Sequence, residues 1–439
     1  MKRLLTLMFT CFFSLVNFSQ VKWEFAKNKD KVSIPFTLVN NLIVVKANLN
    51  NTELNLIVDT GSGLNILFSF PEKDSITFKN TSKIRITGPG IKEPMDAYIS
   101  KTNKLQLKNL STQNLDVILL LQEDFQLSTS VGIPIHGILG ADFFKENIVE
   151  IQYDQKKINV FKKETKRVTA IKNEYKQLPI KIKVDKPYLP IEISLDVTQK
   201  QSLELLVDTG LSDGMWIVEN KFNFIGNTTI ADYLGTGLGG DIYGKRARFN
   251  SLTIADFILE KPIISFPDSI AFTNKNLLIE RNGSLGGGIL NRFSVLFDYK
   301  DEKMYLKANS KISNPFYYNM SGINIHHAGY DVVEEKIRIE GSVQVVNLNE
   351  NIFIDSAHRF NYVLKPGFEI SHIRLNSIAD QLGLKVGDKL VSVNNKLASA
   401  YTMNQLTELF ETAFNQEITI EIDRKGLKKI VKFILKEEI

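Results

Sequence analysis

Apolar and polar residues alternate along two stretches of the chain that end in the same turn sequence. Residues 54–58 (Leu-Asn-Leu-Ile-Val) lead into Asp59-Thr60-Gly61, and residues 203–207 (Leu-Glu-Leu-Leu-Val) lead into Asp208-Thr209-Gly210. Alternation of this kind predicts a half-buried strand, and Asp-Thr-Gly is a typical turn sequence. Each stretch therefore predicts a β-strand that carries an aspartate into a turn.

The two aspartates belong to a longer internal repeat. Asp208 follows Asp59 by 208 − 59 = 149 residues. A second apolar signal follows each aspartate, Gly137-Ile138-Leu139 after 78 residues and Gly288-Ile289-Leu290 after 80. Two signals in the same order at nearly the same spacing predict a duplicated lobe. There are only two copies, so the pattern indicates a pair of lobes and not a solenoid.

The rest of the duplicated region predicts a mainly β fold. Short strands with turns about every ten residues are typical of a sandwich or barrel. A charged stretch at residues 162–167 marks the junction of the lobes, and residues 309–315 mark a further boundary. The predicted division is a signal peptide at 1–20, lobe one at 21–165, lobe two at 166–310 and a third domain at 314–439.

Composition agrees with three packed domains. The chain has 439 residues, and the usual domain size is roughly 150 residues. Hydrophobic residues make up 43% and charged residues 23%, which is typical of a globular protein. The net charge of +5 is spread along the chain, and no basic run contains interleaved aromatic residues. We therefore expect no nucleic-acid partner.

Residues 1–20 predict a secretory signal. Lys2 and Arg3 precede an apolar run at residues 4–16, which is too short to span a membrane as a mature helix. No later segment predicts a transmembrane span. We expect an exported protein that is periplasmic, attached to the cell surface or secreted.

Cysteine and histidine usage argues against a thiolate or metal site. The only cysteine, Cys11, lies inside the predicted signal, so the mature chain would have no disulfide and no cysteine nucleophile. The five histidines have no spacing that is typical of metal ligands. The prediction is that the protein needs no metal and no cofactor.

Asp59 and Asp208 would meet at a pseudo-two-fold axis if the two lobes pack face to face. Two carboxyl groups a few ångströms apart in a desolvated cleft share one proton and titrate as a pair. The ionised member can take a proton from a bound water, and the protonated member can donate to a carbonyl oxygen. This pattern predicts general acid–base hydrolysis.

The sequences Asp59-Thr60-Gly61-Ser62 and Asp208-Thr209-Gly210 resemble those of the aspartic proteases, above all the retropepsin-like bacterial proteins with both lobes in one chain. The resemblance covers about residues 30–310. It implies Asp59 and Asp208 as the catalytic pair and Thr60 and Thr209 as interlocking threonines. It also implies two retropepsin-like β-barrel lobes and hydrolysis of peptide bonds. Gly61, Ser62 and Gly210 would support the catalytic loops.

Two glycine-rich stretches resemble the flap hairpins that close over a substrate in this family. They contain Gly88 and Gly90 in lobe one, and Gly235, Gly237, Gly239 and Gly240 in lobe two. One position departs from the internal repeat, because lobe two has Leu211 where lobe one has Ser62. An apolar residue also occurs there in retroviral-type relatives, so the departure does not exclude activity.

The C-terminal region resembles a PDZ domain. Residues 377–388 (SIADQLGLKVGD) match the S-x-A and G-L-x-x-G-D pattern, with a long insert predicted at about 329–360. The resemblance implies that the backbone N–H groups of Met320, Ser321, Gly322 and Ile323 hold a peptide carboxylate. It further implies that a C-terminal peptide binds by strand addition beside the helix near residues 403–414.

Three alternative interpretations have weaker support. Residues 235–240 satisfy the dinucleotide pattern G-x-G-x-x-G but lack a following helix, and residues 210–214 satisfy the nucleophile pattern G-x-S-x-G without surrounding αβ units. The third alternative is a catalytically inactive protein that keeps the cleft for peptide binding. The favoured prediction is a monomeric aspartic endopeptidase that pairs its lobes within one chain, acts on peptide or protein substrates and carries a PDZ domain.

Overall fold

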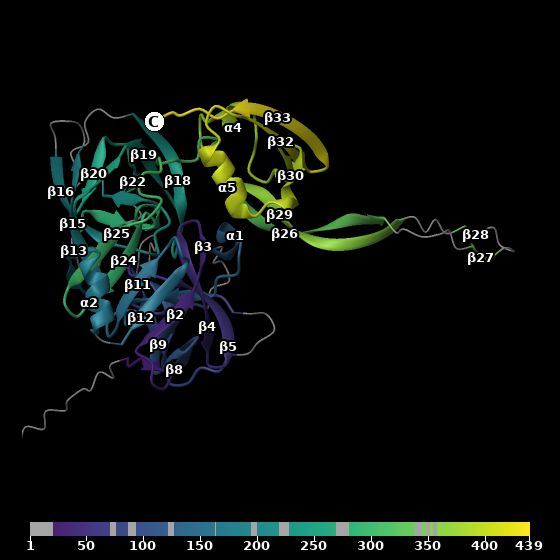
Figure 1. Cartoon of the computed structure of the whole chain (residues 1–439). Helices are drawn as coiled ribbons and strands as arrows, with labels where there is room; N and C mark the ends of the chain where they lie inside the picture. The colour runs from purple at the N-terminus through teal and green to yellow at the C-terminus, as the bar shows by residue number, and fades with distance from the viewer. Residues whose placement is uncertain are drawn as a thin grey trace, which may run out of the picture.

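The computed structural model shows a mainly β protein with two lobes and a smaller C-terminal region (Figure 1). It describes residues 21–439 except 71–75, 87–93, 122–126, 163, 195–199, 219–227, 269–280, 339–344, 348–351 and 354–357. The predicted signal peptide and the glycines at 88 and 90 therefore lie outside the described residues. In the part of the chain that is described, no helix has the length and apolarity needed to cross a membrane.

Lobe one is built on a curved sheet that folds back on itself. Its strand order is β1-β9-β6-β10-β5-β4-β8-β7, with β3 beside β4 and a further pairing of β9 with β8. The elements are β1 (Glu24–Phe25), β3 (Thr37–Val39), β4 (Leu42–Leu49), β5 (Thr52–Val58), β6 (Ile66–Leu67), β7 (Thr81–Ile86), β8 (Met95–Leu107), β9 (Leu110–Leu119), α1 (Leu127–Val131) and β10 (Gly137–Leu139).

Lobe two repeats this plan in the order β18-β19-β22-β17-β23-β16-β15-β20-β21, with β14 beside β15. Its elements are β14 (Lys181–Lys183), β15 (Lys186–Ser194), β16 (Lys200–Val207), β17 (Met215–Ile217), β18 (Thr229–Gly237), β19 (Gly240–Arg248), β20 (Ser251–Ile254), β21 (Phe257–Glu260), β22 (Ile263–Pro267), β23 (Gly283–Leu285) and α3 (Gly287–Leu290).

A third sheet joins the lobes, because each lobe contributes half of it. Its order is β13-β25-β24-β11-β12-β2, and the central β11–β24 pair is antiparallel with Val149 opposite Phe297. Both residues are fully buried, so this sheet is a buried interface that connects the two lobes. The strands are β2 (Lys31–Pro35), β11 (Ile148–Gln152), β12 (Lys157–Phe161), β13 (Lys176–Pro179), β24 (Phe293–Asp298) and β25 (Lys303–Ala308), with η1 (Ala141–Phe143) before β11 and α2 (Lys166–Asn173) between the lobes.

The C-terminal region is a sheet of order β26-β29-β30-β32-β33 with one longer helix packed on it. Thr402 and Gln405 form a capping box at the start of this helix, α5 (Met403–Thr412). The other elements are β26 (Ile323–Arg338), β27 (Val345–Asn347), β28 (Ile352–Phe353), β29 (His358–Ile373), α4 (Ile378–Gln381), β30 (Lys389–Val393), β31 (Lys396–Leu397), η4 (Ala398–Ala400), β32 (Glu417–Arg424) and β33 (Leu427–Ile434).

The stretch predicted as an insert at 329–360 lies mostly on a long hairpin. Strands β26 and β29 remain paired as far out as Arg338 and His358. In Figure 1 this hairpin projects away from the rest of the molecule. The insert therefore lengthens two strands of the sheet.

One expectation about the repeat is wrong in detail. Gly288-Ile289-Leu290 lies in the short helix α3, and the equivalent of β10 is β23, Gly283-Ser284-Leu285. The spacing from Asp208 is 283 − 208 = 75 residues, against 78 in lobe one. A Cβ on Gly283 would lie 1.9 Å from the Trp216 carbonyl oxygen, and one on Gly137 would lie 2.1 Å from that of Ile66. The close approach of a neighbouring strand, which periodicity does not reveal, fixes these two glycines as equivalents.

Candidate active site

The two aspartates stand at equivalent strand ends. Asp59 follows β5, which pairs in parallel with β10, and its N–H donates to the Leu139 carbonyl at 3.0 Å. Asp208 follows β16, which pairs in parallel with β23, and its N–H donates to the Leu285 carbonyl at 2.9 Å. The duplicated sequence therefore produces duplicated backbone geometry up to each carboxyl group.

Thr60 and Thr209 link the lobes through four reciprocal hydrogen bonds. Each backbone N–H donates to the other threonine's Oγ1 at 3.0 Å. Each hydroxyl donates across the axis at 2.7 Å, Thr60 to the Val207 carbonyl and Thr209 to the Val58 carbonyl. Both threonines are buried, so these bonds fix the position of the preceding aspartates.

Each glycine of the two Asp-Thr-Gly turns lies against the carboxyl group of the opposite lobe. A Cβ on Gly61 would lie 2.5 Å from the Asp208 Cγ, and a Cβ on Gly210 would lie 2.3 Å from the Asp59 Cγ. A side chain at either position would displace the facing carboxyl group. The structure thus brings Asp59 and Asp208 together at the seam between the lobes.

The loops hold the two carboxyl groups differently. Asp59 Oδ1 accepts from the N–H groups of Gly61 at 2.7 Å and Ser62 at 3.1 Å, whereas Asp208 Oδ1 accepts from Gly210 at 3.0 Å. The Ser62 hydroxyl donates to the Leu64 carbonyl at 2.7 Å, so it supports the loop and not the aspartate. Leu211 of lobe two lacks this hydroxyl, and its N–H donates to the backbone carbonyl of Asp208 at 3.3 Å and not to the carboxyl group.

Burial raises the pKa of both aspartates. For Asp59 the charge of Asp208 adds to the effect of burial. For Asp208 the nearby cations Arg281 and Lys186 oppose it, as does a hydrogen bond from Asp59. The two carboxyl groups are thus close enough to share a proton and to titrate as a pair.

The aspartates lie in a large cleft between the lobes and the C-terminal region. The cleft has a volume of about 1510 Å³. Apolar side chains from both lobes line it, as is typical of a ligand-binding cleft. They include Leu42, Leu64 and Ile66 of lobe one and Leu211, Leu234 and Leu238 of lobe two.

The predicted flap glycines of lobe two lie on a hairpin at this cleft. Strands β18 and β19 pair up to Gly237 and Gly240, so Leu238 and Gly239 form the tip. Leu238 packs against an apolar cluster of lobe one. Gly235 and Gly240 have positive φ angles of 136° and 108°. The hairpin therefore reaches across the cleft, and two of its glycines are required by backbone conformation.

The two alternative motifs have other structural settings. The G-x-G-x-x-G stretch lies on this β18–β19 hairpin, with a strand in place of the helix that a dinucleotide site needs. The G-x-S-x-G stretch at 210–214 lies between β16 and β17, again without a helix. Among the described residues, no group of three or more histidine, cysteine and acidic side chains could hold a metal ion.

The C-terminal region forms one wall of the same cleft. Ile323 and Ile325 of β26 line it, as do Met403 and Thr407 of α5. The α1 helix of lobe one contacts β26, and a Cβ on Gly132 would lie 3.0 Å from the Met403 Cβ. The groove where strand addition was predicted therefore opens into the cleft that holds the aspartates.

The predicted carboxylate loop already uses most of its N–H groups. Met320 donates to the Phe410 carbonyl at 3.1 Å, and Gly322 donates to the Asn319 Oδ1 at 3.1 Å. Ile323 donates to the hydroxyl oxygen of Ser321 at 3.0 Å. Ser321 itself is fully buried. In this conformation a peptide carboxylate would have to displace these internal acceptors.

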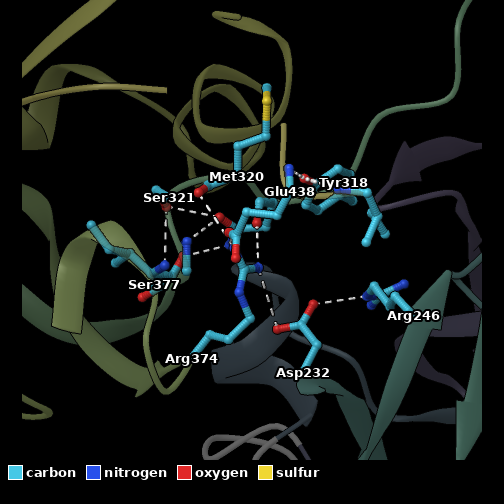
Figure 2. A network of polar contacts seen from close by, with 12 residues as sticks. Asp232, Arg246, Tyr318, Met320, Ser321, Arg374, Ser377 and Glu438 are labelled. Atoms are coloured by element: carbon cyan, nitrogen blue, oxygen red, sulfur yellow. Dashed lines mark hydrogen bonds and ion pairs between the residues drawn. The ribbon is translucent and has the colours of Figure 1, made fainter. Parts of the chain in front are cut away.

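Arg374 connects this loop to the base of the flap hairpin (Figure 2). Its guanidinium donates to the Asn319 carbonyl at 2.6 Å and forms ion pairs with Glu438 and, at 3.8 Å, with Asp232 of β18. Asp232 also pairs with Arg246 at 2.8 Å. A chain of charges thus runs from the C-terminal region into the flap.

Sequence reasoning missed the basic residues beside the aspartates. Lys186, at the start of β15, and Arg281, before β23, both line the cleft. Neither belongs to the repeated Asp-Thr-Gly motif. Alignment of the two hairpin turns that precede the motifs would have singled out Lys186, because its lobe-one equivalent is the apolar Leu42.

Two family models match parts of this chain. Residues 45–143 match the family model described as "Aspartyl protease", and residues 369–424 match the one described as "PDZ domain". No curated protein matches the sequence. Among solved structures, the crystal structure of aspartic proteinase from Irpex lacteus matches with a TM-score of 0.41 and 14% identity, over 65% of this chain and 99% of that one. The chain thus carries an aspartyl protease domain and a PDZ domain.

Proposed function

We propose that this chain, which carries these two domains, is an exported aspartic endopeptidase. Asp59 and Asp208 would activate a water molecule to hydrolyse a peptide bond. The PDZ domain would bind peptide or protein C-termini. The protein would act as a monomer without a metal or cofactor, since both carboxyl groups come from one chain.

The observation that carries the proposal is the crossed arrangement at the seam. The carboxyl group of each lobe faces the glycine of the other, and the two threonines exchange hydrogen bonds across the axis. A pair of buried acids is costly unless they share a proton. Such a pair has a direct use in acid–base hydrolysis.

The chemistry follows from one shared proton. Ionised Asp208 takes a proton from a water molecule as the water oxygen bonds to the substrate carbonyl carbon. Asp59 donates its proton to the carbonyl oxygen, which gives a neutral tetrahedral intermediate. The nitrogen then accepts the proton held by Asp208 while the C–N bond breaks. Return of the intermediate's hydroxyl proton to Asp59 restores the starting state.

The test is cleavage of a mixed peptide library by residues 21–439 across pH 3–8. We expect the wild type to cleave, and Asp59→Asn and Asp208→Asn each to lose at least about 10³-fold in kcat/KM. Asn keeps the shape of Asp but cannot exchange the proton. Equal behaviour of the wild type and both variants would refute the proposal.

Peptide binding without hydrolysis is the second candidate. It is favoured by the position of Ile323, the last residue of the predicted carboxylate loop, which lines the same cleft as the aspartates. In that case the three proteins of the cleavage test would bind library peptides equally and leave them intact. Export is tested separately, by expression of the full chain and N-terminal sequencing of the protein recovered outside the cytoplasm.

A further inference from the structure

Lys186 carries an ammonium group into the cleft beside the two aspartates. It lines the cleft together with Asp59 and Asp208, and its charge acts on both carboxyl groups. Its Cε lies 3.6 Å from the position that a Cβ on Gly63 would take, in the loop that follows Asp59. A lysine of lobe two is thus placed against the aspartate loop of lobe one.

The internal duplication shows that a cation at this position is specific to lobe two. In lobe one the β3–β4 turn at residues 40–41 has φ angles of 46° and 64°, and in lobe two the β14–β15 turn at residues 184–185 has angles of 47° and 64°. The next residue is Leu42 in the first hairpin and Lys186 in the second, each paired across its own hairpin. The backbone therefore accepts an apolar side chain here, and the charge of Lys186 is not a requirement of the fold.

The acids around Lys186 are paired with other cations. Asp185 binds Lys145 at 2.8 Å, and Glu204 binds Lys183 and, at 3.3 Å, Lys181. Within the described residues, the Lys186 ammonium makes no hydrogen bond or ion pair of its own.

Arg281 places a second cation at the same end of the cleft. Its charge acts on both Lys186 and Asp208. The two cations thus lie beside an aspartate pair that holds one negative charge when it shares a proton. Next to the PDZ domain the lining includes Asp232, Glu408 and Glu411, together with Arg246, which pairs with Asp232.

We propose that Lys186, with Arg281 beside it, forms an anion subsite that selects substrates with a carboxylate next to the scissile bond. The carboxylate would come either from an Asp or Glu side chain or from the C-terminus of a short peptide. This inference rests on the proposed peptidase function, which it extends to a substrate class. An ammonium that is partly desolvated and without a partner gains a charge-assisted hydrogen bond when such a substrate binds.

The experiment compares matched peptides that differ by one charge. A peptide cleaved by the wild type is made with Glu or Gln at each position from P3 to P3′, and truncated forms are made with a free or an amidated C-terminus. We expect kcat/KM to favour the anionic member of one pair by about tenfold or more. The preferred pair distinguishes a side-chain carboxylate from a terminal one.

Lys186→Leu, which copies the lobe-one residue, should bring this ratio close to one, whereas Lys186→Arg should keep most of it. Lys181→Leu removes an exposed lysine from the same hairpin and should leave the ratio unchanged. The ratio does not depend on how much of a variant is correctly folded, because both peptides meet the same sample.

Three results would overturn the inference. One is a wild type that cleaves anionic and neutral peptides equally, which leaves the peptidase function intact. Another is a Lys186→Leu variant that loses activity, or shifts its pH profile, equally for both members of a pair. If the wild type cleaves nothing, the proposed function fails. The anion subsite is then tested alone, by measuring the binding of the same peptide pairs by fluorescence anisotropy. Equal affinities for the anionic and neutral peptides would refute the anion subsite.

Discussion

The threonines of the two Asp-Thr-Gly turns each have two tasks that only a hydroxyl can perform. The Thr60 oxygen accepts the N–H of Thr209 and also donates to the Val207 carbonyl, and Thr209 does the same in reverse. A valine of the same shape would leave a buried N–H and a buried carbonyl without partners. Such losses cost about 1–3 kcal/mol each, which explains why both copies of the turn contain threonine.

The buried aspartate pair should make stability depend on pH in a defined direction. Burial and the charge of Asp208 raise the pKa of Asp59 from 3.8 to about 8. Between these pH values the unfolded chain releases this proton while the folded chain keeps it, so the contribution of Asp59 to stability falls as pH rises. For one proton, the free energy of unfolding falls by at most about 1.4 kcal/mol per pH unit.

Asp59→Asn removes this titration. We therefore expect the variant and the wild type to melt at nearly the same temperature at pH 4. At pH 8 the variant should melt at a clearly higher temperature than the wild type. Differential scanning calorimetry of both proteins at several pH values measures the difference. Asp96→Asn is the control: this exposed carboxyl group pairs with Lys83, which lowers its pKa, so the effect should be small and should vary only near pH 4. A difference that falls with pH would contradict the shared-proton arrangement.

At the residue scale the sequence identified the aspartates, threonines and glycines because each recurs at the same place in both halves. Lys186 was not identified, because the residue type at this position differs between the two halves. A repeat reveals what the two lobes need in common, namely the backbone of the turn and the facing acids. A residue that differs between the two sides of the cleft is recognised only when the register of the two hairpins is known.

At the scale of the elements, the β18–β19 hairpin depends on backbone conformations that favour glycine. A Cβ on Gly240 would meet no atom within 4 Å, but its φ of 108° strains any other residue. Gly240→Ala should therefore destabilise the hairpin by about 1 kcal/mol or more. We expect kcat/KM for peptide cleavage to fall several-fold.

Gly239→Ala is the matched control, because Gly239 sits at the same tip without a positive φ. It should retain nearly wild-type kcat/KM, while both variants keep the wild-type melting temperature to within a few degrees. If Gly239→Ala and Gly240→Ala reduced kcat/KM equally, the effect would come from added bulk at the tip and not from backbone strain.

Short elements were the hardest to place from sequence. Gly288-Ile289-Leu290 has the same apolar character as Gly137-Ile138-Leu139, yet one is a helical turn and the other a strand. Three residues are too few for periodicity to separate helix from strand. The deciding contact is the neighbouring backbone against Gly283, which is a tertiary feature. The helix expected near residues 403–414 is long enough to be recognised, and the structure has it as α5 (Met403–Thr412).

At the scale of the whole molecule, the PDZ domain and the two lobes share a cleft and a network of charges. His372 of β29 stacks on Tyr233 of the flap hairpin with ring centroids 3.8 Å apart, and its Nε2 lies 3.1 Å from Asp241 Oδ2. Arg374 adds the contact with Asp232 in the same hairpin. The PDZ domain is therefore positioned by the flap and cannot shift without changing flap contacts.

Arg374 is the residue through which this coupling should be measurable. Its side chain is only 2% exposed and satisfies the carbonyls of Asn319 and Met320 as well as two carboxylates. Arg374→Met should lower the free energy of local opening of β26 and α5 by about 2–4 kcal/mol, because it leaves buried acceptors and Asp232 without this partner. Hydrogen exchange of the amides in these elements measures the loss.

Strands β11 and β24 provide the internal reference. They pair with each other in the sheet that joins the two lobes, and they are far along the chain from Arg374. Their protection should stay at the wild-type level. Arg374→Lys keeps the charge but cannot reach several acceptors at once, so it should resemble Arg374→Met more than the wild type. Full rescue by lysine would mean that charge alone holds the PDZ domain to the flap, and uniform loss of protection in all sheets would mean that the coupling is global and not carried by this residue.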